Sequence, residues 1–236
     1  MLNRFALAGA VLFGLGACEV SSPNVPQMAA SEPAPAVQRR GAPQSLADFR
    51  AVVRRVEPVA ERQCRAMKPG VNCDFHIIVD ERANQPPNAY QTYDKAGRPV
   101  IAFTTALMRE MLNRDELAFA LSHEAAHHIR GHIGQTQSSA VTGAVLGAVL
   151  GSLAGFDSQG VDMLSDIGGT VGARRYSKGF ELEADSLGAR IAQRAGYDPL
   201  RGVLYFVDAA DPGDRFLGTH PPNANRIQVV RASVAR

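Results

Sequence analysis

The sequence contains no tryptophan, no internal repeat and almost no net charge, and these absences reduce the number of function classes that it can belong to. The formal net charge is only +2 at pH 7, and no basic segment is interleaved with aromatic residues, so nucleic-acid binding has no support. Hydrophobic residues nevertheless make up 45% of the 236 residues. That share is typical of a globular protein and provides enough apolar side chains for the core of one domain.

The N-terminus has the features of an export signal. Arg4 precedes a short apolar segment, residues 5–15, and Leu15-Gly16-Ala17-Cys18 resembles a bacterial lipobox. We expect Cys18 to carry lipid, which anchors a protein firmly to a membrane; the alternative is an ordinary signal peptide beside an incidental cysteine. Glu19 stands where an aspartate would signal retention at the inner membrane, so the periplasmic face of the bacterial outer membrane is favoured.

Three segments follow from this interpretation. Residues 1–17 are the signal peptide, and residues 18–45 are the lipidated cysteine with a tether rich in proline and alanine. The folded domain covers residues 46–236 and begins with a helix over about residues 46–67.

The two remaining cysteines, Cys64 and Cys73, are nine residues apart. Export places them in an oxidising compartment, so the sequence predicts a disulfide between them. The alternative is a pair of reduced, buried thiols.

The pattern that carries chemistry is His123-Glu124-Ala125-Ala126-His127. This H-E-x-x-H segment is expected in a helix that is capped by Asn113 and stopped by Gly131. Histidines four residues apart share a helix face and can bind one zinc ion, while Glu124 is placed to take a proton from activated water. The alternative is a helix that merely carries solvated histidines. A single exposed histidine would favour that alternative, whereas a histidine pair with an intervening glutamate in an apolar helix favours zinc.

A third ligand is expected from a second helix. Glu181 and Asp185 are four residues apart and share a helix face, so Glu181 can bind zinc while Asp185 orients a ligand histidine. Glu183 is rotated about 200° from Glu181 and is expected to face away. Taken alone, this segment is typical of an ordinary acidic helix, and only its pairing with H-E-x-x-H favours a metal.

The two motifs together resemble the zinc metallopeptidase family of the CAAX prenyl endopeptidase and HtpX. H-E-A-A-H followed by E-L-E-A-D-S-L-G is similar to the family's H-E-x-x-H and E-x-x-A-D patterns, and the likeness extends over about residues 48–232. It is closest to the periplasmic, Oma-like lipoprotein branch that includes the beta-barrel assembly-enhancing protease. Agreement is also found in Asn88-Ala89-Tyr90, Thr105–Met108 and Thr219–Pro222, although Tyr90 and Ala106 replace the usual Phe and Gly.

The resemblance implies both a fold and a ligand set. The fold is an α+β, mainly helical zincin domain of the gluzincin type, with a small β-sheet. One zinc ion is held by His123, His127 and Glu181. An edge strand beside Asn88, Ala89 and Tyr90 is implied to bind the backbone of the substrate.

The resemblance also brings His220 and Arg226 to the zinc. His220 is expected as a fourth ligand of the resting enzyme, or as a contact to the transition state, a role that Arg226 can share. The alternative is a loop histidine with a structural hydrogen bond.

Local patterns predict a strand over residues 75–79, a loop through Asn88, a second strand over residues 99–104 and a last helix over about residues 199–207. Residues 139–156 form an uncharged run with regularly spaced glycines. We expect this run to pair with residues 161–173 as a soluble helical hairpin, because a single membrane crossing would separate the two metal-binding helices. A hairpin that rests on the membrane or re-enters it is the alternative.

These features predict a membrane-tethered zinc endopeptidase of the cell envelope. Its implied substrates are misfolded, stalled or misassembled envelope proteins, outer-membrane barrels among them, which it would degrade in quality control. Two other functions stay open. One is a chaperone or assembly factor for outer-membrane proteins, either without catalysis or with both roles. The other is a membrane-embedded protease of the HtpX type, which residues 139–156 favour only weakly.

Overall fold

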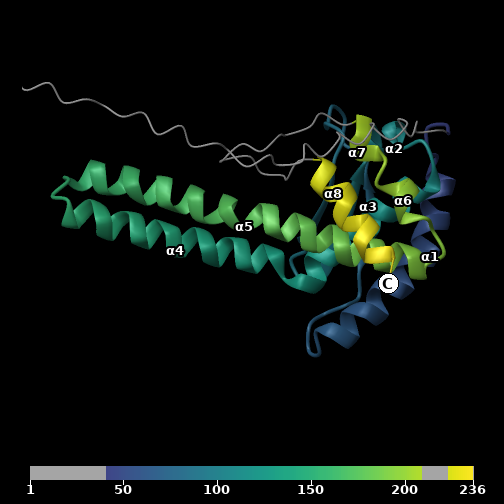
Figure 1. Cartoon of the computed structure of the whole chain (residues 1–236), viewed down its shortest axis with the longest axis horizontal. Coiled ribbons are helices and arrows are strands. Elements are labelled where there is room, and N and C mark those ends of the chain that lie inside the picture. The colour runs from purple at the N-terminus through teal and green to yellow at the C-terminus, as the bar shows by residue number, and fades with distance from the viewer. Residues whose placement is uncertain (1–40, 209–222, 236) are drawn as a thin grey trace, which may run out of the picture. The chain divides into compact units, whose positions relative to one another are not determined.

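The computed structural model describes residues 41–208 and 223–235, with the backbone alone for residues 171–177 and 207–208. The described residues belong to one compact unit, Val37–Arg236. Its elements, which Figure 1 labels in part, are α1 (Leu46–Met67), β1 (His76–Asp80), β2 (Ala89–Tyr93), β3 (Pro99–Thr104), α2 (Thr105–Glu110), α3 (Arg114–Arg130), α4 (His132–Leu153), α5 (Ser158–Arg194), α6 (Pro199–Gly202), α7 (Tyr205–Asp208) and α8 (Asn223–Val234). The expected mainly helical α+β domain with a small sheet is confirmed.

The sheet has three strands in the order β1-β3-β2. β3 is buried along its whole length and pairs in parallel with β1 and antiparallel with β2. The loop expected around Asn88 is therefore wrong in part, because residues 89–93 form the edge strand β2. Tyrosine and threonine favour extended structure in this segment, and the turn that follows contains Gly97 at a φ of 77°, a conformation that suits glycine.

The hydrophobic core lies between the sheet, α1, α3 and the C-terminal part of α5. Helix α1 contributes Phe49, Val52 and Val56, which are buried because they recur at helical spacing. A disulfide joins Cys64 near the end of α1 to Cys73 just before β1, the pair predicted from the sequence. It fixes the helix to the start of the sheet.

Helix α3 begins and ends where its sequence predicts. The Asn113 side chain accepts a hydrogen bond from the Glu116 amide at 3.0 Å, and Gly131 ends the helix in the left-handed conformation. In a capping box, the Glu116 carboxylate would accept a hydrogen bond from the Asn113 amide. Here it accepts from the preceding amide, that of Leu112, at 2.8 Å. Both ends of the helix that carries H-E-x-x-H are thus specified locally.

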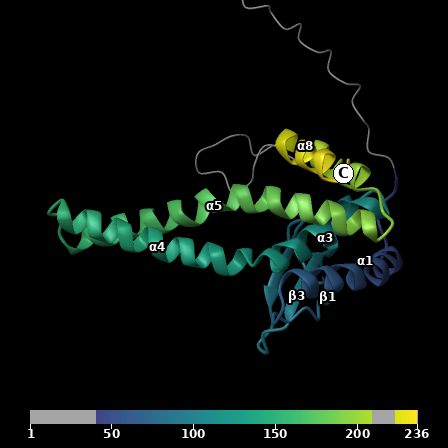
Figure 2. The ribbon, with the colours of Figure 1, turned by 60° about the horizontal axis from the view of Figure 1, so that its bottom comes forward.

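Helices α4 and α5 form an antiparallel hairpin whose two ribbons lie side by side in both views (Figures 1 and 2). The partner stretch expected over residues 161–173 is not a separate helix, because α5 continues from Ser158 through the metal-binding segment to Arg194. No helix within the described residues is long and apolar enough to cross a membrane.

The last helix differs from the expectation. In place of one helix over residues 199–207, the chain forms two single turns, α6 and α7, and α8 follows near the C-terminus. The break comes after Gly202, a residue with low helix propensity. A Cβ there would lie 2.6 Å from the Asp115 carbonyl oxygen, so glycine lets this turn pack closely on α3.

Candidate metal centre

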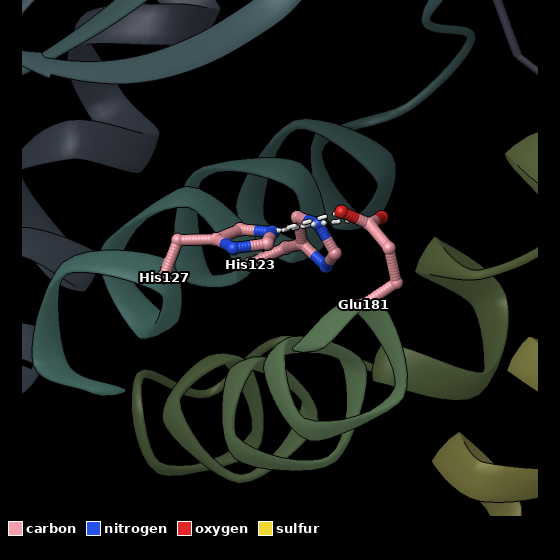
Figure 3. A group of neighbouring side chains, drawn as sticks. All are labelled: His123, His127 and Glu181. Carbon is pink, nitrogen blue, oxygen red and sulfur yellow. Dashed lines mark hydrogen bonds and ion pairs between the residues drawn. The ribbon is translucent and has the colours of Figure 1, made fainter. Parts of the chain in front are cut away.

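Two helices bring three potential metal ligands together. His123 and His127 come from α3 and Glu181 comes from α5, and Figure 3 shows the three side chains converging. The two Nε2 atoms are 3.0 Å apart, and the Glu181 carboxylate oxygens lie 3.5 Å from His123 Nε2 and 3.3 Å from His127 Nε2. Within the part of the chain that the structure describes, this is the one such cluster of histidine, cysteine and acidic side chains.

The spacing of the three donors fits zinc. Ligand atoms about 2.0–2.1 Å from a tetrahedral zinc ion lie roughly 3.3 Å from one another, and the observed separations of 3.0–3.5 Å bracket that value. Two imidazoles and one carboxylate also leave a fourth position for water, which is typical of catalytic rather than structural zinc sites. His123, His127 and Glu181 are therefore the residues that would hold the ion.

Asp185 orients the first of these histidines. His123 Nδ1 lies 2.9 Å from Asp185 Oδ1, so a proton on Nδ1 leaves the Nε2 lone pair directed at the cluster. Burial opposes a positive charge on His123, but hydrogen bonds to Asp185 and Glu181 outweigh it and raise the pKa of the imidazole to about 10. Surroundings that favour a cation in this way also favour a metal ion.

Arg226 from α8 holds the buried Asp185 carboxylate with two hydrogen bonds. Its Nε and Nη2 donate to the two carboxylate oxygens at 2.8 Å each, a bidentate arrangement that only arginine makes. Burial favours a neutral carboxyl, yet the bonds from Arg226 and His123 hold the pKa of Asp185 below its usual value. The guanidinium also lies 3.7 Å above the Phe206 ring.

Arg226 therefore reaches the centre, as the sequence analysis expected, but through Asp185. Its Nη2 is 3.6 Å from Glu181 Oε2 and 3.5 Å from His123 Nδ1. The guanidinium can position two members of the site at once, and it lines the same cavity as the ligands.

A glycine allows α5 to approach the ligand helix. A Cβ at Gly188 would lie 2.9 Å from both the amide nitrogen and the Cα of His123, so any side chain there would push the two helices apart. Glu181 and Asp185 stand on the same helix, and both contact His123. The close approach at Gly188 thus sets the depth at which α5 presents its carboxylates.

Glu124 lines a cavity of about 590 Å³ together with the three ligands. Burial raises the pKa of its carboxyl, against the opposing charges of His123 and His127. A carboxylate with a raised pKa is a better proton acceptor than one in water. The position and the environment of Glu124 both suit a general base.

The edge strand β2 forms one side of this cavity. Asn88, Ala89 and Tyr90 line it, and β2 pairs with β3 along one edge only among the described residues. An extended peptide can add to such an edge through backbone hydrogen bonds. The three residues expected to bind substrate therefore stand beside the metal cluster.

Two expected site residues lie outside the described residues, namely Cys18 and His220. Glu183 is separate from the cluster, with a side chain that is 54% exposed, although its Oε2 approaches His132 Nε2 to 3.6 Å.

His132 is a residue of the centre that the sequence analysis missed. It is buried at the start of α4, stacks on Phe180 and places its Nδ1 2.9 Å from His127 Nδ1. Burial and the neighbouring His127 lower the pKa of His132 to about 3, so its imidazole is neutral and can accept a hydrogen bond. The available signal was a further histidine five residues after the second ligand, beyond a glycine that ends the helix.

Comparison with protein-family models identifies the chain. Residues 47–234 match the model of peptidase family M48, and comparison with curated proteins gave no match. The matched segment includes α3, α5, α8 and the whole described part of the metal centre. The chain belongs to peptidase family M48, a family of metallopeptidases.

Proposed function

We propose, from this membership of peptidase family M48, that the protein is a zinc endopeptidase of the bacterial cell envelope that cleaves misfolded or misassembled envelope proteins. The observation that carries the proposal is the convergence of His123, His127 and Glu181 at zinc-ligand spacing, with Glu124 on the same cavity. A purely structural metal site would not need a carboxylate poised beside an open position.

The side chains around the cavity account for the steps of peptide hydrolysis. Zinc, when bound, acts as a Lewis acid on the scissile carbonyl and lowers the pKa of water to about 7. Glu124 takes a proton from the attacking water and passes it to the leaving amide nitrogen. Asp185 and Arg226 keep His123 in one tautomer and orientation through the bonds at 2.8–2.9 Å.

The edge of β2 supports a preference for unfolded chains. Binding by strand addition uses the substrate backbone, so it needs an extended segment and little sequence specificity. Tyr90 is held by hydrogen-bond contact with Asp80 at 3.2 Å, which steadies the strand. A folded protein offers few such segments, whereas a misfolded envelope protein offers many.

The envelope location rests on the sequence. The segment ending in Cys18 resembles a lipobox, and a disulfide between Cys64 and Cys73 suits an oxidising compartment. We place the protein on the periplasmic face of the outer membrane, tethered through lipid on Cys18.

Cleavage of an unfolded outer-membrane barrel by the zinc-loaded chain tests the proposal. The wild type should release fragments, and a chelator should stop it until zinc is restored. Glu124→Gln preserves the shape but cannot accept the proton, so cleavage should slow by roughly 100-fold or more while the zinc content is unchanged. A metal-loaded Glu124→Gln protein that still cleaves normally would contradict the role of Glu124.

The chaperone alternative gives a different result in the same assay. Wild type and Glu124→Gln would then suppress aggregation of the barrel equally, and neither would produce fragments.

A further inference from the structure

In the hairpin of α4 and α5, glycines make the closest contacts between the helices and most of the large apolar residues lie outside. In α4 the buried positions after His132 are Gly147 and Gly151. The large aliphatic residues of this helix after Ile133 are 49–80% exposed, and they are Val141, Val145, Leu146, Val149, Leu150 and Leu153. Phe156 in the turn and Met163 and Ile167 on α5 are 50–56% exposed as well.

The glycines produce this arrangement by bringing the two backbones together. A Cβ at Gly147 would collide with the Leu164 carbonyl, and one at Gly168 would collide with the Gly143 carbonyl. Leu146 and Leu150 each precede one of the buried glycines and lie about 100° from it round the helix, and their side chains are 58% and 64% exposed. The hairpin is held largely by backbone contact at these glycines, and Val161 and Leu164 of α5 direct large side chains inward, against Gly151.

This distribution suits lipid better than water. In water, a helical hairpin gains stability by burying large aliphatic side chains between its helices. In lipid, small residues form the contact between helices because the surrounding hydrocarbon already solvates the large ones. Residues 131–156 also contain no Asp, Glu, Lys or Arg, whereas the rim of a protein interface is polar.

The length of the apolar segment limits how the hairpin can enter a bilayer. Its exposed aliphatic residues run from Val141 to Leu153, about 20 Å of helix, which is too short to cross hydrocarbon about 30 Å thick. Near the start of α5, two exposed acidic residues, Asp162 and Asp166, are four residues apart and share one face of the helix. They lie about 100° from Met163 and Ile167, so they can stay in water while the apolar residues enter lipid.

We infer that the hairpin Val141–Ile167 is a membrane-docking element that inserts the outer face of α4, with Phe156, Met163 and Ile167, into one leaflet of a bilayer. It lies at the interface rather than spanning the membrane, because its apolar segment is too short to cross the hydrocarbon. The tether of residues 19–45 reaches at most roughly 100 Å when fully extended, so lipid on Cys18 would keep the hairpin near a membrane surface. The docking itself needs neither that lipid nor catalysis.

Vesicle binding by a chain without the lipid tests this inference. The mature chain, residues 18–236 with Cys18→Ser, is mixed with vesicles of phosphatidylethanolamine and phosphatidylglycerol, and bound protein is separated by flotation. It should bind, and the combined change Leu146→Gln, Leu150→Gln and Leu153→Gln should weaken partitioning by at least about 100-fold.

The matched control makes the same kind of change elsewhere. Leu46, Val71 and Leu200 are 40–44% exposed but scattered, and replacing all three by glutamine should leave binding unchanged. Replacing Asp162 and Asp166 by asparagine should also preserve it. Binding should survive salt at about 1 M, because the exposed face of α4 has no charge to screen.

Three results would overturn the inference. One is an equal loss of binding in the hairpin variant and the scattered control. Another is binding that requires phosphatidylglycerol and disappears in high salt. The third is a dimer of the lipid-free chain, measured by light scattering, that the hairpin variant abolishes, since the leucines would then contact a second copy. Zinc content and circular dichroism check that each variant is folded.

Discussion

The two ends of α5 belong to one helix but differ in where their large apolar side chains lie. Near its C-terminus Ala184, Leu187 and Ile191 are buried in the core, and Asp185 is buried with both carboxylate oxygens bonded. Near its N-terminus Met163 and Ile167 are exposed, and glycines make the contact with α4. One end therefore follows the packing of a water-soluble domain, while the other follows the packing of helices in lipid.

The difference shows how one helix can serve two tasks. A metal centre needs side chains held within fractions of an ångström, which a close-packed core provides. A surface that docks on lipid needs only its apolar area, which the exposed residues of α4 and α5 supply. A single helix also connects Glu181, the proposed metal ligand, to the proposed docking face.

Truncating one leucine in the core and one in the hairpin should give the largest difference in the free energy of unfolding. Leu187→Ala removes a buried side chain and should lower the free energy of unfolding by about 2–5 kcal/mol. Leu150→Ala removes a side chain that is 64% exposed and should change it by less than about 0.5 kcal/mol. Urea denaturation of the lipid-free chain measures both, and equal losses would show that the hairpin has a hidden core.

Two carboxylates of α5, those of Glu181 and Glu183, should differ in their contribution to zinc affinity. Glu181→Ala removes a proposed ligand and should weaken zinc affinity by more than about 100-fold, since outer partners of a ligand alone contribute 10–100-fold. Glu183→Ala serves as the control, because that side chain is 54% exposed and lies outside the cluster. Competition with a chelator, followed by elemental analysis of folded protein, measures both, and similar losses would refute the ligand assignment.

The disulfide should stabilise the domain that holds the metal and not the hairpin. Replacing Cys64 and Cys73 together by serine opens a short loop and should lower the free energy of unfolding by about 2–3 kcal/mol. Vesicle binding by the lipid-free chain should not change, because the bridge joins α1 to the segment before β1 and includes no residue of α4 or α5. Two free thiols in protein isolated under alkylating conditions would show that the bridge is not formed in the cell.

Features set by local chemistry could be predicted from the sequence. Asn113 and Gly131 mark the ends of α3, and the spacing of His123 and His127 places both ligands on one face. Asp185 could be assigned to its role from its distance along the helix to Glu181. Each of these depends on a few neighbouring residues and on the period of the helix.

Features set by tertiary contacts could not be predicted from the sequence. The continuity of α5 and the outward direction of Leu150 depend on how closely Gly147 approaches the partner helix, and a glycine pattern alone does not fix that distance. The turns at α6 and α7 depend likewise on the packing of Gly202 against α3. The contact of His132 required α4 to begin directly after Gly131, with an angle between the two helices that the sequence does not specify.

The contact of His132 also gives the smallest and most specific effect. His127 Nε2 faces the cluster, so its Nδ1 carries the proton and donates to His132 Nδ1 at 2.9 Å. Such a bond fixes the orientation of a ligand histidine and is worth about 10–100-fold in metal affinity. His132→Phe keeps an aromatic ring to stack on Phe180 but removes the acceptor, so zinc should bind about 10–100-fold more weakly.

A conservative variant separates this positioning role from simple packing. His132→Asn replaces the ring but retains an acceptor near the position of Nδ1, and it should recover most of the affinity that His132→Phe loses. Chelator competition gives the zinc affinity, and the visible spectrum of the cobalt-substituted protein reports the geometry at the ligands. If the phenylalanine variant binds zinc as tightly as the wild type, or if asparagine is the weaker of the two, then His132 contributes stacking on Phe180 and does not position His127.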